Sequence, residues 1–411
     1  MNLWLITNIR ILRHEPLPSH AIQNLQTAAA LAELGHGVLV WVGALEGAPD
    51  GGGRGLIEER LGRPLPGGVR LLAYRPRGAR EEKKTPFASP LARLINTLRA
   101  RLAAPPPEAV ITRSPRLLAQ LHGSWLRPAG ARLILEYQYP EWAQLWRAWR
   151  KRNPAAPLGA CVARLREWRR REDAWLALAD GILYAASGHK LLLEQAQYAG
   201  PAEWIPSGCL PPELAPVGKA ADAPQEYDVG FVGSLAPENG LECLLEALGA
   251  MDRVNALVVG GGPKPYVEAL KRRAGQLGLD ARVTFAGALA FGAVRAQMRR
   301  CRVGVAPISH RRGPEKRQFA SPLKLIEWMA AGAAVVATAV PSVFQQAVDG
   351  RNALLVPPES PGALAGAIGR LLRDEALRTR LAQGGLASAG QAAYPNRAQI
   401  VAGFIERLRR R

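Results

Sequence analysis

The sequence has no long apolar run and few cysteines. None of its uninterrupted apolar runs reaches the ~18–20 residues that a membrane-spanning helix needs. The apolar start is interrupted by Asn8, Arg10 and Arg13, so we expect neither a cleaved leader nor an anchoring span. The four cysteines form no C-x-x-C pair and have no histidine at zinc-ligand spacing. This predicts reduced thiols, a cytoplasmic location and no bound metal.

Negative charge is also scarce. The 411 residues include 54 Lys and Arg against 34 Asp and Glu, a formal net charge of +20. Arginine greatly outnumbers lysine, and alanine, glycine and proline are abundant, as high-GC coding would produce. The basic residues do not alternate with aromatic residues in the manner of a nucleic-acid groove. Nucleic acid is therefore not an expected partner.

The residues that are present indicate a globular protein. Hydrophobic residues make up 48% of the chain and charged residues 21%, which excludes intrinsic disorder and collagen-like repeats. At ~100–200 residues per domain, the length predicts two or three domains.

Strand-like and helix-like patterns alternate along the chain. The first unit is a buried strand at 3–6, a helix over 21–34 that Gly35 ends, and a second strand at 38–42. Residues 46–68, rich in Gly and Pro, are predicted to be a loop. Further strands are expected at 69–73, 109–112, 133–136, 181–184, 228–232, 255–259, 283–285, 303–306, 334–338 and 353–356. This alternation predicts an α/β protein with parallel sheets.

A segment dense in Pro and Ala suggests the domain boundary. We expect an N-terminal Rossmann-like domain at 1–205, a linker at 206–224 and a C-terminal Rossmann-like domain at 225–395. Residues 396–411 are expected to form a C-terminal helix that could return to the N-terminal domain. Both domains are expected to be doubly wound, with ligands at the carboxyl ends of their strands and a cleft between the facing domains.

The most informative window is 321–332. Ser321 is a good N-cap, Pro322 suits the first helical position and Gly332 suits the end, so a short helix is well specified. Its apolar residues at helical spacing are expected to face the core; these are Leu323, Ile326 and Ala330.

Lys324 and Glu327 are three residues apart and share one face of this helix. A cation in the first turn opposes the helix dipole, which makes sense if an anion docks there and also contacts the free N–H groups. That combination suits a nucleotide diphosphate, with Glu327 accepting hydrogen bonds from ribose hydroxyls. A solvated ion pair between the two side chains is the open alternative.

Five further segments accompany this helix: 231–235, 239–247, 257–263, 283–287 and 348–358. In this order they resemble the retaining glycosyltransferases of the GT-B fold, family 4 (glycosyl transferases group 1). The resemblance implies two doubly wound Rossmann-like domains, the first binding an acceptor and the second a nucleotide-sugar donor. It also implies transfer of a sugar from a UDP- or GDP-sugar, with retention, to a hydroxyl of a glycan or lipid-linked acceptor in cell-envelope or exopolysaccharide synthesis. The chain has no Asp-x-Asp motif, in keeping with a fold that uses neither a metal nor another cofactor.

Residue by residue, the resemblance also implies the donor site. Two departures from the family pattern stand out: Phe319 occupies the position of its first glutamate, and Ser234 and Asn239 occupy those of its usual Arg and Lys. Lys324 and the basic segment 310–317 are expected to supply the missing positive charge. The expected donor-binding residues are Gly233, Ser234, Gly261, Phe285, Gly287, Arg311, Gly313, Ser321, Pro322, Leu323, Lys324 and Glu327.

In the N-terminal domain, Ser19 and His20 stand where the family has two glycines, and Ser19 is expected to cap the following helix. His20 joins Lys324 and Glu327 as an expected catalytic residue, with a helix-start role as its alternative. The expected acceptor-binding residues are Ser19, His20, Arg113, Glu136 and Tyr137.

Trp142, Trp146 and Trp149 lie on one helix face and are followed by many arginines. An aromatic face with basic flanks is typical of interfacial helices, so peripheral contact with an anionic membrane, at the inner face of the plasma membrane, is one hypothesis. Coverage of the N-terminal core by the tryptophans is the other.

Two other functions remain open from the sequence. One is a GT-B binding protein without transferase activity, which the departures at Ser234, Asn239 and Phe319 favour. The other is a nucleotide-sugar epimerase or glycogen-type synthase of the same fold. The sequence makes no prediction of oligomeric state.

Overall fold

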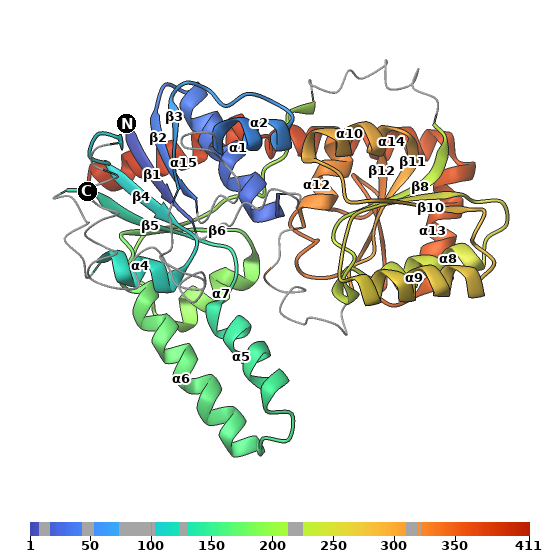
Figure 1. Cartoon of the computed structure of the whole chain (residues 1–411), viewed down its shortest axis with the longest axis horizontal. Coiled ribbons are helices and arrows are strands. Elements are labelled where there is room, and N and C mark those ends of the chain that lie inside the picture. The colour runs from blue at the N-terminus through green and yellow to red at the C-terminus, as the bar shows by residue number, and fades with distance from the viewer. Residues whose placement is uncertain are drawn as a thin grey trace. The chain divides into compact units, whose positions relative to one another are not determined.

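The computed structural model describes residues 1–7, 17–42, 53–73, 100, 103–122, 130–212, 225–309, 319 and 322–411. The chain divides into two compact units (Figure 1). The first comprises Met1–Glu58, Pro64–Pro206 and Arg397–Arg411, and the second Glu59–Arg63 and Ser207–Asn396. The last residues of the chain thus belong to the same unit as the first ones.

The first unit contains a parallel sheet, with seven strands among the described residues, in the order β3-β2-β1-β4-β5-β6-β7. Its central strands are continuous apolar runs, as expected where helices cover both faces of a parallel sheet. The strands are β1 (Asn2–Ile6), β2 (Gly37–Val42), β3 (Val69–Ala73), β4 (Ala109–Thr112), β5 (Arg132–Tyr137), β6 (Gly181–Tyr184) and β7 (Ala202–Trp204).

The described helices of this unit connect successive strands or close the chain. They are α1 (Ser19–Glu33), α4 (Pro115–His122), α5 (Glu141–Arg152), α6 (Leu158–Leu176) and α7 (Ser187–Gln195), with most of α2 (Gly53–Leu61) and of α15 (Tyr394–Arg409). α1 starts one residue earlier than a Ser19 cap would require. Pro18 is the N-cap, in extended conformation, and Ser19 is the first helical residue with no capping role. The expected Ser19 cap is therefore wrong.

The prediction of a loop over 46–68 is wrong in part, because α2 (Gly53–Leu61) lies within it. Arg54 stabilises this helix despite the flanking glycines: its guanidinium bonds Glu58 one turn later (2.8 Å) and the Val69 carbonyl (2.9 Å). Ile57 and Leu61 are buried on its inner side. Tertiary contacts here outweigh the low helix propensity of glycine.

The second unit contains another parallel sheet, in the order β10-β9-β8-β11-β12-β13. All its strands lie at or within one or two residues of the predicted ranges. They are β8 (Tyr227–Val232), β9 (Ala256–Val259), β10 (Val283–Gly287), β11 (Cys301–Ala306), β12 (Ala334–Thr338) and β13 (Leu354–Val356). The described helices are α8 (Leu241–Gly249), α9 (Lys264–Gln276), α10 (Phe291–Arg299), α12 (Leu323–Ala330), α13 (Pro361–Arg373) and α14 (Glu375–Gln391), with the short 3-10 helix η2 (Pro237–Asn239).

One apolar cluster lies on each face of this second sheet. The first gathers β8, α8 and α13, with Phe231, Leu244 and Ile368 fully buried. The second cluster lies on the other face, where the strands pack against α12, and it includes the fully buried Trp328. Each cluster consists of side chains that alternate along the strands, so both faces of the sheet are covered.

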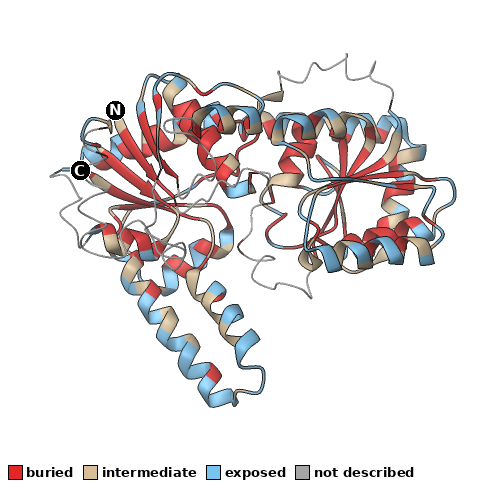
Figure 2. Cartoon of the chain, viewed as in Figure 1, coloured by how far each residue is buried: buried red, intermediate tan, exposed pale blue. Residues whose placement is uncertain are grey.

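α5 and α6 form a hairpin whose far end is largely exposed in Figure 2. Its tryptophans pack within the hairpin: the Trp146 and Trp149 rings stack at 5.7 Å, and Trp149 meets Trp168 of α6 edge-on at 6.3 Å. Trp146 and Trp149 therefore do not support the hypothesis that the tryptophans cover the N-terminal core, which stays a prediction for Trp142. Membrane contact of this hairpin stays a prediction. Within the described ranges, no helix has the length and apolar character needed to cross a bilayer.

Candidate active site

Glycines line the carboxyl edge of the second sheet. Gly233 follows β8, and its N–H donates to the Val259 carbonyl (3.0 Å); Gly260 follows β9 and donates to Gly287 (2.8 Å). At Gly260, with φ +152°, a Cβ atom would lie 1.8 Å from the Gly233 carbonyl oxygen. Only glycine permits this close approach, which brings three strand ends together. The predicted residues Gly233, Gly261 and Gly287 all lie on this edge.

Lys324, in the first turn of α12, lies beside the end of β8. Its Nζ donates to Asn239 Oδ1 (2.9 Å) and lies 4.8 Å from the centre of the Phe231 ring. A Cβ at Gly233 would be 3.3 Å from the same Nζ. Asn239 in turn donates to the hydroxyl of the exposed Ser234 (2.8 Å). The lysine thus places positive charge next to the two positions where the family pattern has Arg and Lys.

Glu327 lies one turn further along α12 and is 7% exposed. Its Oε2 accepts from Arg295 of α10 (3.2 Å), and Arg295 also donates to the carbonyls of Leu210 (2.9 Å) and Pro211 (3.1 Å). Burial raises the pKa of the Glu327 carboxyl, although the Arg295 guanidinium and the nearby Leu210 N–H oppose that effect. Glu327 Oε1 is buried and makes no hydrogen bond within the described part of the chain. The alternative of a solvated Lys324–Glu327 pair is wrong, since each side chain has another partner.

Of the other predicted donor residues, three are not described by the structure and one has a different helix position from the predicted one. Arg311, Gly313 and Ser321 lie outside the described residues. Pro322 is the N-cap of α12, in extended conformation, so the expectation that it is the first helical residue is wrong; Leu323 has that position. Because a proline has no side-chain acceptor, the first N–H groups of α12 have no cap from this residue.

Two further donor-site positions are half-buried or buried. Phe285 is half-buried and packs against the apolar cluster of β8 and α8. Phe319, at the family's first-glutamate position, is 4% exposed, and its apolar ring offers no polar group to a ligand.

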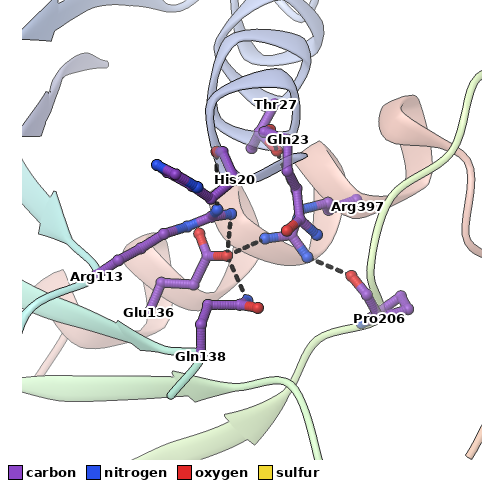
Figure 3. Close-up of polar contacts among 8 residues, drawn as sticks. All are labelled: His20, Gln23, Thr27, Arg113, Glu136, Gln138, Pro206 and Arg397. Atoms are coloured by element: carbon purple, nitrogen blue, oxygen red, sulfur yellow. Dashed lines mark hydrogen bonds and ion pairs between the residues drawn. The ribbon is translucent and has the colours of Figure 1, made fainter. Parts of the chain in front are cut away.

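A second polar cluster lies at the carboxyl edge of the first sheet, all of it within the first unit (Figure 3). Glu136, near the end of β5, accepts on Oε1 from Arg113 (2.5 Å), from Arg397 (2.5 Å) and from Gln138 (2.7 Å). Burial alone would raise the pKa of Glu136, but the two guanidinium groups hold it below its usual value. Glu136 is thus an ionised buried carboxylate that neutralises neither arginine completely.

Arg397 joins distant parts of the first unit. It is fully buried, and its guanidinium donates to Thr27 Oγ1 of α1 (3.0 Å), to the Pro206 carbonyl and to Glu136. Arg397 therefore links the C-terminal segment to α1, to β5 and to Pro206, where the middle stretch of this unit ends.

His20 and Arg113 lie at the solvent side of this cluster. Arg113 donates to the His20 carbonyl (3.1 Å), and the His20 side chain is exposed, as is that of Ser19. Partial desolvation of the ring and, secondly, the charge of Arg113 lower the pKa of His20. His20 is therefore neutral near pH 7 and can accept as well as donate a proton.

Tyr137 is buried inside the first unit and contacts other side chains there. It is 1% exposed, its hydroxyl donates to Glu172 (2.6 Å), and its ring meets that of His189 edge-on at 4.8 Å. Burial raises the pKa of Glu172 to about 7, although the hydrogen bonds from Tyr137 and the Trp142 N–H oppose this. With this burial Tyr137 is not accessible to an acceptor, so we do not carry its expected acceptor role further.

The sequence patterns did not indicate two of these residues. Arg295 and Arg397 contact their partners through the fold rather than through neighbouring positions, and no motif marks them. The described residues contain no group of three or more His, Cys, Asp or Glu that could hold a metal ion.

Comparison with known proteins supports the assignment of the second unit. Residues 226–374 match the family described as glycosyl transferases group 1. A phosphatidyl-myo-inositol mannosyltransferase of Mycobacterium leprae is 34% identical over 187 residues, which is 44% of this chain and 47% of that protein. The matched segments span less than half the length of the curated relatives.

Solved structures match the whole chain. Sucrose-phosphate synthase from Thermosynechococcus elongatus aligns over 99% of this chain and 98% of its own, with a TM-score of 0.74 and 21% identity. HepE of Anabaena, in complex with UDP-glucose, aligns over 98% of this chain and 99% of its own, with a TM-score of 0.67 and 18% identity. At these identities the likeness concerns the fold, and it confirms the predicted architecture of two parallel-sheet α/β domains of the GT-B kind.

Proposed function

We propose that this GT-B chain is a glycosyltransferase that moves a sugar from a nucleotide diphosphate sugar to an acceptor hydroxyl. The match of residues 226–374 to glycosyl transferases group 1 supports the reaction class. The likeness to a structure that holds UDP-glucose supports a donor of this kind. The observation that carries the proposal is the position of Lys324, whose ammonium group lies at the glycine-lined end of β8.

In this proposal the departing diphosphate lies against the end of β8 and the start of α12. Cleavage of the glycosidic bond leaves negative charge on the phosphate nearest the sugar, and the Lys324 ammonium group and the N–H groups in the first turn of α12 stabilise it. The close glycine turns let the backbone approach the phosphates without a Cβ between them. Charge stabilisation by Lys324 needs no metal.

Glu327 would hold the nucleoside. Its Oε1 lacks a hydrogen-bond donor among the described residues, and a ribose hydroxyl is a donor that fits this need. Arg295 keeps the other oxygen occupied and so fixes the direction of the carboxylate.

We further propose membership of family 4, retention at the anomeric carbon, and an acceptor that is a glycan or lipid-linked glycan of the cell envelope, bound by the first unit. The names of the relatives support this in part, since one is a phosphatidyl-myo-inositol mannosyltransferase. Phe319 favours a second candidate, a binding protein that holds the nucleotide sugar without transferring it, because the first carboxylate of the family pattern is missing there. That protein would bind the donor but release no nucleoside diphosphate from it.

Glu327→Gln tests the nucleoside contact. We expect the affinity for the donor nucleotide, measured by isothermal titration calorimetry, to fall by about ten- to hundredfold, because hydrogen bonds to a charged acceptor contribute roughly 1.5–3 kcal/mol. Glu268→Gln is the matched control, since Glu268 is an exposed carboxylate on α9. Unfolding curves of both variants separate loss of binding from loss of the Arg295 pair. Unchanged affinity in folded Glu327→Gln would contradict this role.

A further inference from the structure

Glu359, in the turn between β13 and α13, has a strained backbone. Its φ angle is +49°, in the left-handed region that favours glycine. Among the described residues Gln197 and Arg253 share this feature, and both are exposed at the surface. Glu359 differs from them because it is half-buried and its carboxylate makes a short hydrogen bond. Strain at a residue whose side chain is held by a partner indicates a role for that side chain.

The Glu359 carboxylate accepts from the hydroxyl of Ser309. The distance from Ser309 Oγ to Glu359 Oε1 is 2.5 Å, as in a hydrogen bond from a hydroxyl to an ionised carboxylate. Ser309 is 7% exposed and follows β11, whereas Glu359 follows β13, and β12 lies between these two strands in the sheet. The bond therefore connects two strand ends that are not neighbours, at the carboxyl edge of the second sheet.

Ser309 is bonded in turn to η2, which carries the partner of Lys324. Its backbone N–H donates to the Glu238 carbonyl (3.2 Å). η2 also lies very close to the segment after β11, since a Cβ at Gly240 (φ +68°) would be 1.6 Å from a carbonyl oxygen of that segment. The residue after Glu238 is Asn239, whose Oδ1 accepts from Lys324 Nζ (2.9 Å). Consecutive short contacts therefore connect the end of β11 to the Lys324 ammonium group.

From these contacts we propose that Glu359 is a positioning residue: through Ser309 and η2 it holds the Lys324 ammonium group at the end of β8. The role of Lys324 in transfer rests on the proposed function, whereas its positioning through Glu359 does not. A glycine would relieve the strain at position 359, but it has no side chain that could hold Ser309. Because Glu359 acts through Lys324, it affects transfer more than it affects binding of the nucleoside.

Glu359→Gly separates the strain from the hydrogen bond. Relief of the strain offsets loss of the bond in stability, so we expect an unfolding temperature within about 3 °C of wild type, whereas turnover should fall about tenfold. Arg253→Gly is the matched control: it relieves the same kind of strain in the same unit and should keep wild-type turnover. Glu359→Gln retains an acceptor oxygen for Ser309 and should recover most of the turnover.

Chemical labelling tests the positioning without any donor. Reductive methylation of the lysines, followed residue by residue by mass spectrometry, measures how firmly each ammonium group is held. We expect Lys324 to react several-fold faster in Glu359→Gly and in Ser309→Ala than in wild type, and no faster in the double variant than in either single one. Lys271, which is exposed on α9, should react equally in all of these proteins.

Turnover should show the same coupling. In the Lys324→Met background, Glu359→Gly should cause no further loss, because the group that it positions is absent. Additive losses there, or unchanged labelling of Lys324 in Glu359→Gly, would overturn the proposal. Failure of the proposed function gives a different result: neither UDP nor GDP would bind the wild-type protein, while the labelling of Lys324 would still respond to Glu359→Gly.

Discussion

Lys324→Met should lower the turnover of glycosyl transfer by on the order of 10²–10³, with a smaller effect on donor affinity. Negative charge on the phosphate nearest the sugar grows as the glycosidic bond breaks, so a fixed cation stabilises the transition state more than the bound donor. Initial rates and the dissociation constant of the donor, measured on the same preparation, separate the two effects. Lys271→Met, an exposed lysine on α9, is the matched control and should retain wild-type turnover.

A charge-relocation variant makes this prediction sharper. Lys324 Nζ lies 2.9 Å from Asn239 Oδ1, so a lysine at position 239 would bring an ammonium group to nearly the same place from η2. Asn239→Lys in the Lys324→Met background should therefore restore a large part of the turnover. If Lys324→Met alone keeps full turnover, the phosphate charge is stabilised by other residues and the assignment of Lys324 fails.

Glu136→Gln should destabilise the first unit by about 3–5 kcal/mol, because it removes the carboxylate from two arginines, one of them fully buried. Denaturant unfolding followed by tryptophan fluorescence measures this loss. Glu203→Gln is the control, since its pair with Arg407 is exposed and should contribute only ~0–1 kcal/mol.

The same carboxylate makes stability depend on pH. The pKa of Glu136 is lower in the folded protein than its usual value, so the ionised group stabilises the fold above the unfolded-state pKa of about 4.3. That contribution is lost as the pH falls through the folded-state pKa. Wild type should therefore lose more stability than Glu136→Gln between neutral pH and the acid range, and parallel pH profiles for the two proteins would contradict the assigned role.

Most of the fold could be predicted because its strands differ clearly in residue type from the segments between them. Runs such as Val38–Val42 and Ala334–Thr338 are buried on both faces and consist of apolar, largely β-branched residues. β7 was missed because it is a three-residue strand at the edge of its sheet with no buried side chain. α2 was missed because the glycines and prolines of this segment predict a loop. The helix is stabilised by hydrogen bonds from Arg54 to carbonyls beyond it, and these cannot be predicted from local sequence.

The candidate site could be predicted where a residue belongs to a local pattern. Lys324 and Glu327 lie on a helix that its own sequence specifies, so their common location follows from spacing alone. Arg295 reaches Glu327 from a different helix, and Arg397 reaches Glu136 across 261 positions of the chain. Such contacts depend on how the chain folds back on itself, and an arginine on a helix gives no sign beforehand of being buried.

We propose above all that the second unit holds a nucleotide diphosphate sugar for transfer. Thermal unfolding of the wild-type protein with UDP-, GDP-, ADP- and TDP-sugars tests it most directly, because a donor at 100 times its dissociation constant adds about 2.7 kcal/mol of stability. We predict that at least one of these donors raises the unfolding temperature, that the matching nucleoside diphosphate does so too, and that Glu327→Gln clearly reduces the shift. An unfolding temperature unchanged by every donor at millimolar concentration would contradict the account.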